Sequence, residues 1–472
     1  MSPTTRVVTA QDWTGPDDPE NPHNWSMWIR AYHTIPPSLF GFVVTFGSSV
    51  YTPAVEDVMK QFSVSSTAAF LGLSLYVVGL AFGPVLAAPI SETHGRNVVY
   101  KLSLPISMLF TLGVGFSQNF ASLLVCRFFA GFFGSPVLAV GAGTNADLFP
   151  PHLRAVATSL FLMAPFAGPS LGPVVGGFAA QYKTWRWTQW SILFISVAVY
   201  LTSLPMRETY KKIILKRRAA RLGIEPPKSP TGIAALKTLL TITLFRPLHM
   251  LATEPIVLFL SMYTAFAFAV LFSFFAAFPI VFKNAPYHFT ISQVGLTFLA
   301  IGLGVAAGST SSIVIDRTIY QKHYHQALSD GRAHAAPEHR LYSAMLGSFG
   351  MPIGLFWFAW SADKGAHWAV PVVAAIPFAW GNVSLFISMA LYLIDVYGPL
   401  NGASAIAGNG ILRYMLGATF PLFTIQMYTK LGIGWATSLL GFLSVLMLPI
   451  PWILYKWGPQ IRSKSAYPTF IK

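Results

Sequence analysis

The sequence predicts an all-α membrane protein with twelve transmembrane helices, and three observations carry this prediction. Hydrophobic residues make up 54% of the 472-residue chain and charged residues only 10%, whereas roughly a quarter of the residues in a soluble protein are charged. The apolar residues gather into stretches of about 20, which is the length that crosses a hydrocarbon core of about 30 Å. The cations fall between these stretches, mostly on one predicted side of the membrane.

The apolar stretches form two groups of six, separated by a basic polar segment. We expect them at residues 31–53, 67–89, 98–117, 120–146, 155–180 and 187–205, and then at 251–282, 292–315, 341–360, 368–394, 403–428 and 434–455. This order predicts two six-helix bundles, with the following plan: a tail at 1–30, a bundle at 31–205, a linker at 206–250, a bundle at 251–455 and a tail at 456–472.

The positions of the cations predict the orientation of the chain. The first 27 residues are polar and contain no apolar core of a signal peptide, so we expect the chain to begin in the cytosol. With that start, 23 of the 31 Lys and Arg residues fall in cytosolic segments and six on the opposite side. This asymmetry follows the positive-inside rule and predicts that both termini are cytosolic. The net charge of +15 therefore reflects topology and does not indicate nucleic-acid binding.

Two cations, Arg127 and Arg413, fall inside predicted spans. An arginine at membrane depth is costly unless it is paired or faces a polar cavity, so both are expected in the interior of the bundle. The linker sequence at 211–221 is basic and favours either a helix lying on anionic lipid or a solvated connector. The histidines of the loop at 320–339 are irregularly spaced, so we predict no metal site and no cofactor.

The clearest local pattern is Gly168-Pro-Ser-Leu-Gly172-Pro-Val-Val-Gly176-Gly177 in the fifth span. Glycines at every fourth position let a neighbouring helix approach closely. Pro173 removes a backbone donor and can bend the helix. The pattern by itself is compatible with a hinge between two states or with a static helix contact.

This pattern resembles the antiporter signature of the major facilitator superfamily, G-x-x-x-G-P-x-x-G-G, at every fixed position. The resemblance implies the two-bundle fold of that superfamily and outward transport. The segment Ala88 to Arg96 is similar to the superfamily's loop motif G-x-x-x-D-R-x-G-R, with Ala88, Glu92 and Thr93 where Gly, Asp and Arg are usual. Leu123-x-x-x-Arg127-x-x-Ala130-Gly131 resembles L-x-x-x-R-x-x-Q-G, with Ala130 in place of Gln.

Further segments resemble the fungal twelve-span drug:proton antiporters, a group that also exports polyamines and toxins. They are residues 18–26, 208–210, 215–219, 392–397 and 449–452, and the resemblance extends from about residue 18 to 465. It implies a monomeric exporter that needs only a small-molecule substrate, a lipid bilayer and a proton gradient. The family's usual location is the plasma membrane, with the vacuolar membrane second.

Three groups of polar residues are candidates for the mechanism. Arg127, Arg413 and Glu254 are the candidates for the polar core and proton coupling, although Glu254 is equally compatible with a helix start favoured by the helix dipole. Four residues at the cytosolic ends of neighbouring spans are expected to latch the two halves in the outward-facing state, or to form an ordinary surface ion pair; they are Glu92, Gly95, Arg96 and Asp147.

The first, fourth, seventh and tenth spans line the central cavity in this superfamily, so their aromatic and amide residues are the predicted substrate contacts. An aromatic cavity with few fixed charges suits amphipathic or planar organic molecules. Aromatic residues in spans more often pack or face lipid, so packing or lipid contact is the alternative for each of these side chains. They are Phe42, Phe46, Asn145, Tyr263, Phe266, Phe272, Trp380, Asn382 and Tyr392.

The expected function is therefore export of small amphipathic organic molecules in exchange for protons. A proton-independent facilitator or importer of the same fold is the first alternative, supported by the shortage of carboxylates in the middle of the spans, and a polyamine exporter is the second. No metal-ligand set, nucleophile–base pair or Gly-rich phosphate loop is evident in the sequence, so we do not predict an enzyme.

Overall fold

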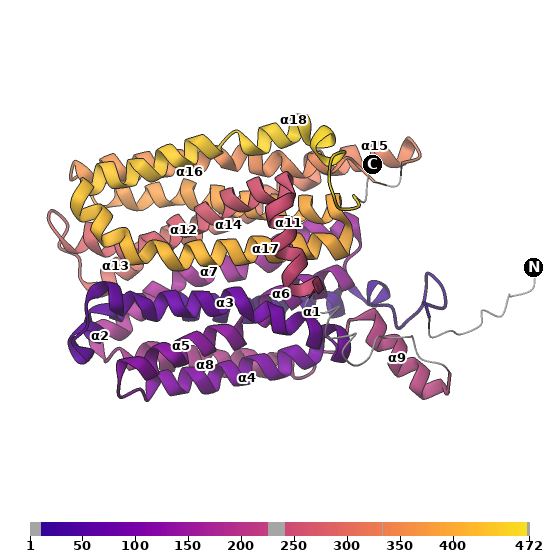
Figure 1. Cartoon of the computed structure of the whole chain (residues 1–472), viewed down its shortest axis with the longest axis horizontal. Helices are drawn as coiled ribbons and strands as arrows, with labels where there is room; N and C mark the ends of the chain where they lie inside the picture. The colour runs from indigo at the N-terminus through magenta and orange to yellow at the C-terminus, as the bar shows by residue number, and fades with distance from the viewer. Residues whose placement is uncertain (1–10, 225–240, 333, 470–472) are drawn as a thin grey trace, which may run out of the picture.

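The computed structural model describes residues 11–224, 241–332 and 334–469. These residues form helices and connecting loops. The long helices run side by side, and the N-terminal and C-terminal halves of the chain form two adjacent groups (Figure 1). We call the end of the bundle where α1 begins and α18 ends the terminal end, and the opposite end, where α2 and α13 lie, the distal end.

The N-terminal half contains the six predicted apolar stretches as helices. The fourth stretch is interrupted at Ser135 because Pro136 cannot donate a backbone hydrogen bond within the helix. The short amphipathic helix α2 lies at the distal end. The helices are α1 (Met27–Ser49), α2 (Val55–Phe62), α3 (Ser66–His94), α4 (Arg96–Gly115), α5 (Phe120–Gly134), α6 (Pro136–Leu148), α7 (Pro151–Tyr182) and α8 (Arg186–Ser203).

The C-terminal half repeats this plan. The last three spans lie largely within α17, whose backbone leaves the helical region at Gly398 (φ 71°) and Gly432 (φ 75°). A straight helix of 79 residues would be about 120 Å long, and these two glycines are where the chain reverses instead. The helices are α12 (Pro255–Lys283), α13 (Ile291–Thr297), α14 (Leu299–Ile315), α16 (Tyr342–Asp363), α17 (Ala369–Met447) and α18 (Ile450–Arg462).

Ten stretches in the described part of the chain are long and apolar enough to cross a membrane. The last of them, Asn401–Arg462, has 62 residues and contains two passes separated at Gly432. The helix α8 is not among the ten, yet it has 18 residues and packs against α1 and α4. The structure is therefore consistent with the predicted count of twelve.

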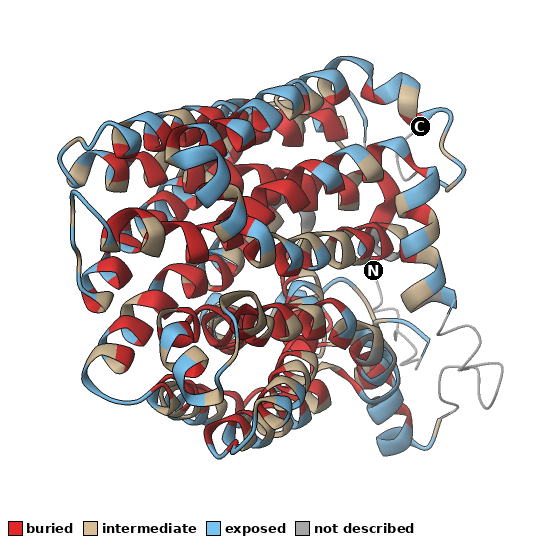
Figure 2. Cartoon of the chain, turned by 60° about the vertical axis from the view of Figure 1, so that its left-hand side comes forward, coloured by how far each residue is buried: buried red, intermediate tan, exposed pale blue. Residues whose placement is uncertain are grey.

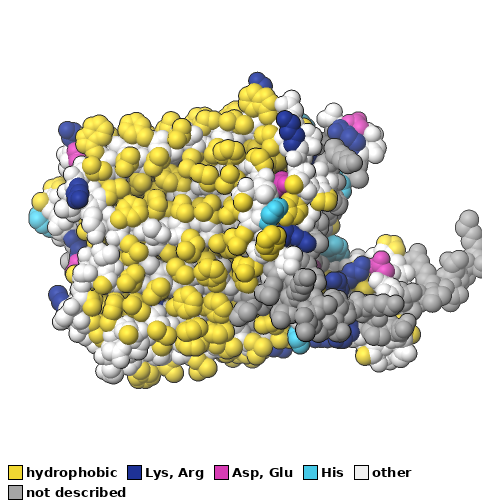
Figure 3. All heavy atoms as spheres, in the orientation of Figure 1, with side chains coloured by type: hydrophobic (Ala, Val, Ile, Leu, Met, Phe, Trp, Pro, Cys, Tyr) yellow, Lys and Arg dark blue, Asp and Glu magenta, His cyan; other side chains and the backbone are white. Residues whose placement is uncertain are grey.

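The surface of the bundle is apolar in the middle and charged at its ends (Figure 3). Large hydrophobic side chains such as Leu109, Phe194 and Leu446 are exposed there, while the buried residues follow the inner faces of the helices (Figure 2). Such a continuous apolar belt is expected of a protein surrounded by lipid. The chain is a multi-pass membrane protein.

Shorter helices cluster at the terminal end. They are η1 (Pro22–Asn24), α9 (Lys211–Leu222), η3 (Thr241–Phe245), α11 (Arg246–Thr253), η4 (Asp316–Tyr320), α15 (Gln321–Ser329) and η5 (Pro337–Leu341), and η2 (Thr52–Ala54) lies before α2.

The N-terminal tail binds the basic linker helix α9. The guanidinium of Arg218 donates to both carboxylate oxygens of Asp18 at 2.8 Å and to Glu20 at 2.6 Å. Arg221 also pairs with Glu20, and Lys211 donates to Asp12 at 2.6 Å. The tail therefore neutralises one face of the linker helix, a contact that neither reading of the linker sequence anticipated.

Candidate transport site

Arg127 of α5 is buried inside the N-terminal half and is 1% exposed. Its guanidinium donates to the carbonyl oxygens of Gly72 at 2.9 Å, Gly47 at 2.7 Å and Ser48 at 3.3 Å. Tyr51 and Tyr76 stack on it, with ring centroids 4.8 and 4.4 Å from Cζ. The charge is thus shared by backbone dipoles of α1 and α3 and by two aromatic faces, which holds three helices together.

Arg413 lies about midway along the middle pass of α17, between the reversals at Gly398 and Gly432. Its guanidinium is enclosed by the rings of Phe386, Tyr414 and Phe268, whose centroids are 4.5, 4.5 and 4.9 Å from Cζ. The side chain is half-buried, and its buried Nε–H has no hydrogen-bond acceptor. Arg127 and Arg413 therefore both lie within spans but differ in how fully their hydrogen-bond donors are used.

Glu254 precedes the first residue of α12 and is 2% exposed. Its carboxylate accepts from the hydroxyls of Tyr397 at 2.8 Å and Ser465 at 2.7 Å, and from the backbone N–H of Ala466 at 2.9 Å. These three donors join the C-terminal tail to α12 and α17. The contacts favour the structural role that the sequence left open for Glu254.

Two of the four predicted latch residues form an ion pair. Arg96 Nε donates to the carboxylate of Asp147 at 3.2 Å, and the ring of Tyr210 stacks on the guanidinium, with its centroid 4.6 Å from Cζ. Gly95 has φ of 102°, a conformation that favours glycine. A Cβ at Gly95 would also collide with the carboxylate of Glu208. That carboxylate accepts from the backbone N–H of Arg96 at 2.9 Å.

The latch is expected in the outward-facing state and stays a prediction. In this conformation Glu92 is exposed and forms no ion pair within the described residues, whereas the carboxylate of Glu208 accepts from the backbone N–H of Arg96. Arg96, Asp147 and Glu208 also all belong to the N-terminal half. They connect α4, α6 and the segment after α8, and do not join the two halves in this conformation.

The C-terminal half carries a matching cluster that the sequence reasoning missed. Arg340 donates to Asp395 at 2.7 Å and to Asp316 at 2.9 Å, and its Cζ lies 3.5 Å from the centroid of the Tyr320 ring. The spacing could have revealed it, because Arg340 and Asp395 are 55 residues apart whereas Arg96 and Asp147 are 51 apart.

The glycines of α7 at positions 168, 172, 176 and 177 place this helix against both halves. Along one face, Cβ atoms at Gly168, Gly172 and Gly176 would collide with Thr45 and Ser49 of α1 and with Val50, which follows it. These three glycines therefore allow α7 to touch the α1 backbone directly.

At the distal end the same helix reaches the other half. A Cβ at Gly177 would lie 2.9 Å from the carbonyl oxygen of Ile291 in α13, and one at Gly295 of α13 would collide with the carbonyl of Pro173. Elsewhere on the seam between the halves, Ser74 donates to the carbonyl of Ala418 at 2.6 Å. The halves are thus in backbone contact at the distal end.

The predicted substrate residues are distributed over both halves, and none of them lines either of the two hollows described below. In the N-terminal half, Phe42 stacks on Phe46 at 5.6 Å, and Asn145 donates to Ala157 at 3.5 Å. In the C-terminal half, Trp380 donates to Ser311 at 2.9 Å and Tyr263 to Ser348 at 3.4 Å; Phe266, Phe272, Asn382 and Tyr392 are buried.

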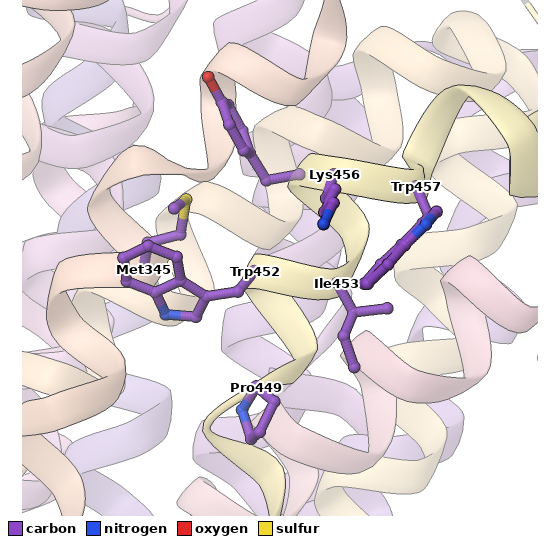
Figure 4. Close-up of a pocket in the computed structure, with 7 residues that line it drawn as sticks. Met345, Pro449, Trp452, Ile453, Lys456 and Trp457 are labelled. Atoms are coloured by element: carbon purple, nitrogen blue, oxygen red, sulfur yellow. The ribbon is translucent and has the colours of Figure 1, made fainter.

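Two hollows lie elsewhere in the structure. The larger, of about 370 Å³, is an apolar recess on the outer side of α16 and α18, lined by Met345, Trp452, Ile453 and Trp457 (Figure 4). The smaller, of about 20 Å³, lies between the halves on the terminal side, among polar residues that include Ser159 of α7 and Ser388 of α17. It has room for about one water molecule.

A membrane protein of two six-helix halves, with a matching arginine–carboxylate cluster in each, has the architecture of a secondary transporter. The family model described as Major Facilitator Superfamily matches residues 38–420. The chain belongs to this superfamily, whose members are transporters.

Comparisons with individual proteins agree. The chain is 41% identical to "Polyamine transporter 4" of Saccharomyces cerevisiae, over 97% of this chain and 73% of that protein. It is 36% identical to "Major facilitator superfamily multidrug transporter FLU1" of Candida albicans, over 96% of this chain and 75% of that protein. The solved structure of the proton:xylose symporter XylE has the same fold, with a TM-score of 0.66 and 16% identity over 92% of this chain and 96% of that one.

Proposed function

We propose that this protein exports small amphipathic organic molecules in exchange for protons, by alternating access between two conformations. The observation that carries the proposal is the glycine face of α7. It brings α7 into backbone contact with α1 in its own half and with α13 in the other half.

The glycine face gives alternating access a physical basis. Gly177 and Gly295 seal the distal end, and their contacts are between backbones with no interlocking side chains. Smooth surfaces of this kind can separate and rejoin without repacking side chains. Opening this seal while the terminal side closes would expose the interior to the opposite face of the membrane.

The relatives support export of organic molecules. One is named as a multidrug transporter and another as a polyamine transporter. We propose the plasma membrane as the location, with the vacuolar membrane second, and cytosolic termini, in agreement with the cation asymmetry.

The alternative of a proton-independent facilitator or importer is favoured by one observation. In the described chain the carboxylates of the spans lie near helix ends, as Asp147, Glu254, Asp316 and Asp395 do, and not at mid-membrane depth. A polyamine exporter is the other alternative, supported by the Saccharomyces relative.

Transport in sealed vesicles tests the proposal. The full chain is reconstituted with its terminal side outward, and uptake of rhodamine 6G and of 8-anilinonaphthalene-1-sulfonate is measured with and without an acidic lumen. One dye is cationic and the other anionic, so the result does not depend on the charge of the substrate.

We expect at least one dye to accumulate several-fold faster with an acidic lumen, and a protonophore to abolish the difference. Equal rates with and without the gradient would contradict proton exchange. Uptake that occurs only from the distal side would contradict export.

A further inference from the structure

We propose that Arg413 binds the anionic group of the substrate, so that the transporter selects planar organic anions over organic cations. This inference rests on the proposed function only in taking the substrate to be a small amphipathic organic molecule. It assigns a negative charge to that molecule, and it names Arg413 as the residue that binds the charged group.

The first step is the contrast between the two arginines inside the bundle. Arg127 uses its guanidinium on three carbonyl oxygens of its own half. The guanidinium of Arg413 lies among three aromatic rings, and its Nε–H is buried without an acceptor. Burying a hydrogen-bond donor of a charged group without an acceptor costs free energy inside a membrane protein. Arg413 therefore has unused capacity for an acceptor that is absent from the described chain.

The second step is the form of the Arg413 site. Three aromatic rings surround the guanidinium, and one of them, Phe386, packs on Phe166 of the other half at 5.1 Å. The charge thus lies beside the seam that must open and close during transport. Rings at this position present apolar faces to a planar molecule. The guanidinium presents paired N–H donors that fit a carboxylate or sulfonate.

The third step is the space next to Arg413. Gly410 precedes it by three residues on the same helix, and residues with this spacing share a face. A Cβ at Gly410 would meet no atom within 4 Å. Open space therefore adjoins Arg413 on the side toward the terminal end.

The fourth step is the sign of the charge in the interior. The two arginines that lie inside the described spans, Arg127 and Arg413, are positive, and the acids of the spans lie near helix ends. A polyamine would bring several positive charges toward these two arginines, with no carboxylate nearby among the described residues of the spans to pair with them. An organic anion would instead complete the hydrogen bonding of Arg413.

The test uses a matched pair of probes of opposite and permanent charge. Equilibrium binding of 2-naphthalenesulfonate and of 2-naphthyltrimethylammonium is measured on the purified full chain in detergent. The variants are Arg413→Gln, Arg413→Lys and, as a control that removes an exposed cation at the distal end, Lys364→Gln. Elution as a single species confirms folding.

We expect the unaltered protein to bind the sulfonate at least about 10-fold more tightly than the ammonium. Loss of a charge-assisted hydrogen bond should weaken sulfonate binding in Arg413→Gln by about 10- to 100-fold, and leave ammonium binding unchanged or stronger. Arg413→Lys should fall between, because it keeps the charge and loses the planar donors. Lys364→Gln should match the unaltered protein.

Equal affinity for the two probes, or preference for the ammonium, in the unaltered protein overturns the inference without any variant. An equal loss of both probes in a folded Arg413→Gln protein overturns it as well. Selective sulfonate binding with no response to a pH gradient in vesicles would refute proton-coupled export and leave this inference standing.

Discussion

Arg340 donates to the carboxylate of Asp395 at 2.7 Å, in the same place in the C-terminal half that the pair of Arg96 and Asp147 occupies in the N-terminal half. Both arginines begin or precede a helix, and a tyrosine ring stacks on each of them. The C-terminal cluster is the more buried one, since Arg340 has a side chain that is 3% exposed and Arg96 one that is 17% exposed. Each half thus uses an arginine–carboxylate cluster to hold its helix ends together, and the two clusters differ in how deeply they are buried.

Replacing Arg340 by Gln should destabilise the protein strongly. The change leaves the buried Asp316 and the partly buried Asp395 without their cation, and removing one partner from a buried ion pair typically costs about 3–5 kcal/mol. The measurement is the midpoint of thermal unfolding in detergent, which we expect to fall by several degrees.

The matched control for Arg340 is Arg332→Gln in the preceding loop. Arg332 pairs with Asp330, and both side chains are about half exposed. An exposed pair contributes about 0–1 kcal/mol, so the midpoint should hardly move. Equal shifts of the unfolding midpoint in the two variants would show that burial of the Arg340 cluster does not increase its contribution to stability.

Replacing Gly177 by Val should open the distal end. The added side chain would meet the backbone of α13 at Ile291 and Ser292, so the closed seal can no longer form. The accessibility of a cysteine introduced at the seam reports this opening, in a chain whose single native cysteine, Cys126, is first changed to Ser. We expect labelling from the distal side to increase several-fold.

Val175 on the same helix provides the comparison for Gly177. Its side chain is 37% exposed, so Val175→Ala removes surface on the outside of the bundle and should leave labelling unchanged. Unaltered labelling in Gly177→Val would contradict the role of this glycine in the seal.

Replacing Asp18 by Asn should release the N-terminal tail from α9. Burial alone would raise the pKa of Asp18, but the backbone donors of Thr14 and Glu20 and the guanidinium of Arg218 lower it to about 2 from 3.8. The Asp18–Arg218 contact is therefore fully stabilising above about pH 4 and is lost as the pH falls through about 2. Tail binding should be constant between pH 5 and 8.

Hydrogen exchange of the α9 amides, followed by mass spectrometry at pH 7, measures this release. Exchange should be several-fold faster in Asp18→Asn than in Asp17→Asn, whose side chain is exposed next to it. Equal exchange in the two variants, or release on moving from pH 8 to 5, would contradict the assigned contact.

Replacing Glu254 by Gln separates a structural role from proton transfer. The neutral amide presents a donor where three donors already converge, so the C-terminal tail should detach and stability should fall by about 1–3 kcal/mol. Vesicle uptake should keep its response to an acidic lumen. Loss of that response in a protein of normal stability would instead assign proton transfer to Glu254.

The fold was predictable because lipid imposes a simple rule on each span. Long apolar runs predicted the positions of the spans, and Gly398 and Gly432, at the ends of such runs, are where the backbone reverses. The break at Pro136 was not predicted, because an apolar stretch continues through it and gives no change in composition.

The site was less predictable, because polar contacts depend on direction as well as position. Glu92 lies within the loop motif, yet the structure leaves it exposed. Glu208 was known only as part of a resembling segment, and its contact with Arg96 spans 112 residues. No local pattern encodes such a distant partner.

The helix α8 has a consequence for how the protein is made. It is the one predicted span outside the ten that qualify by length and hydropathy in the described chain. Its buried face carries Thr188, Gln189 and Ser196, and it packs against α1 and α4. Alone in a nascent chain, α8 would enter lipid weakly. We therefore expect α8 to insert cooperatively. Its insertion should be complete only once α1 and α4 are in the membrane and can pack against its polar face.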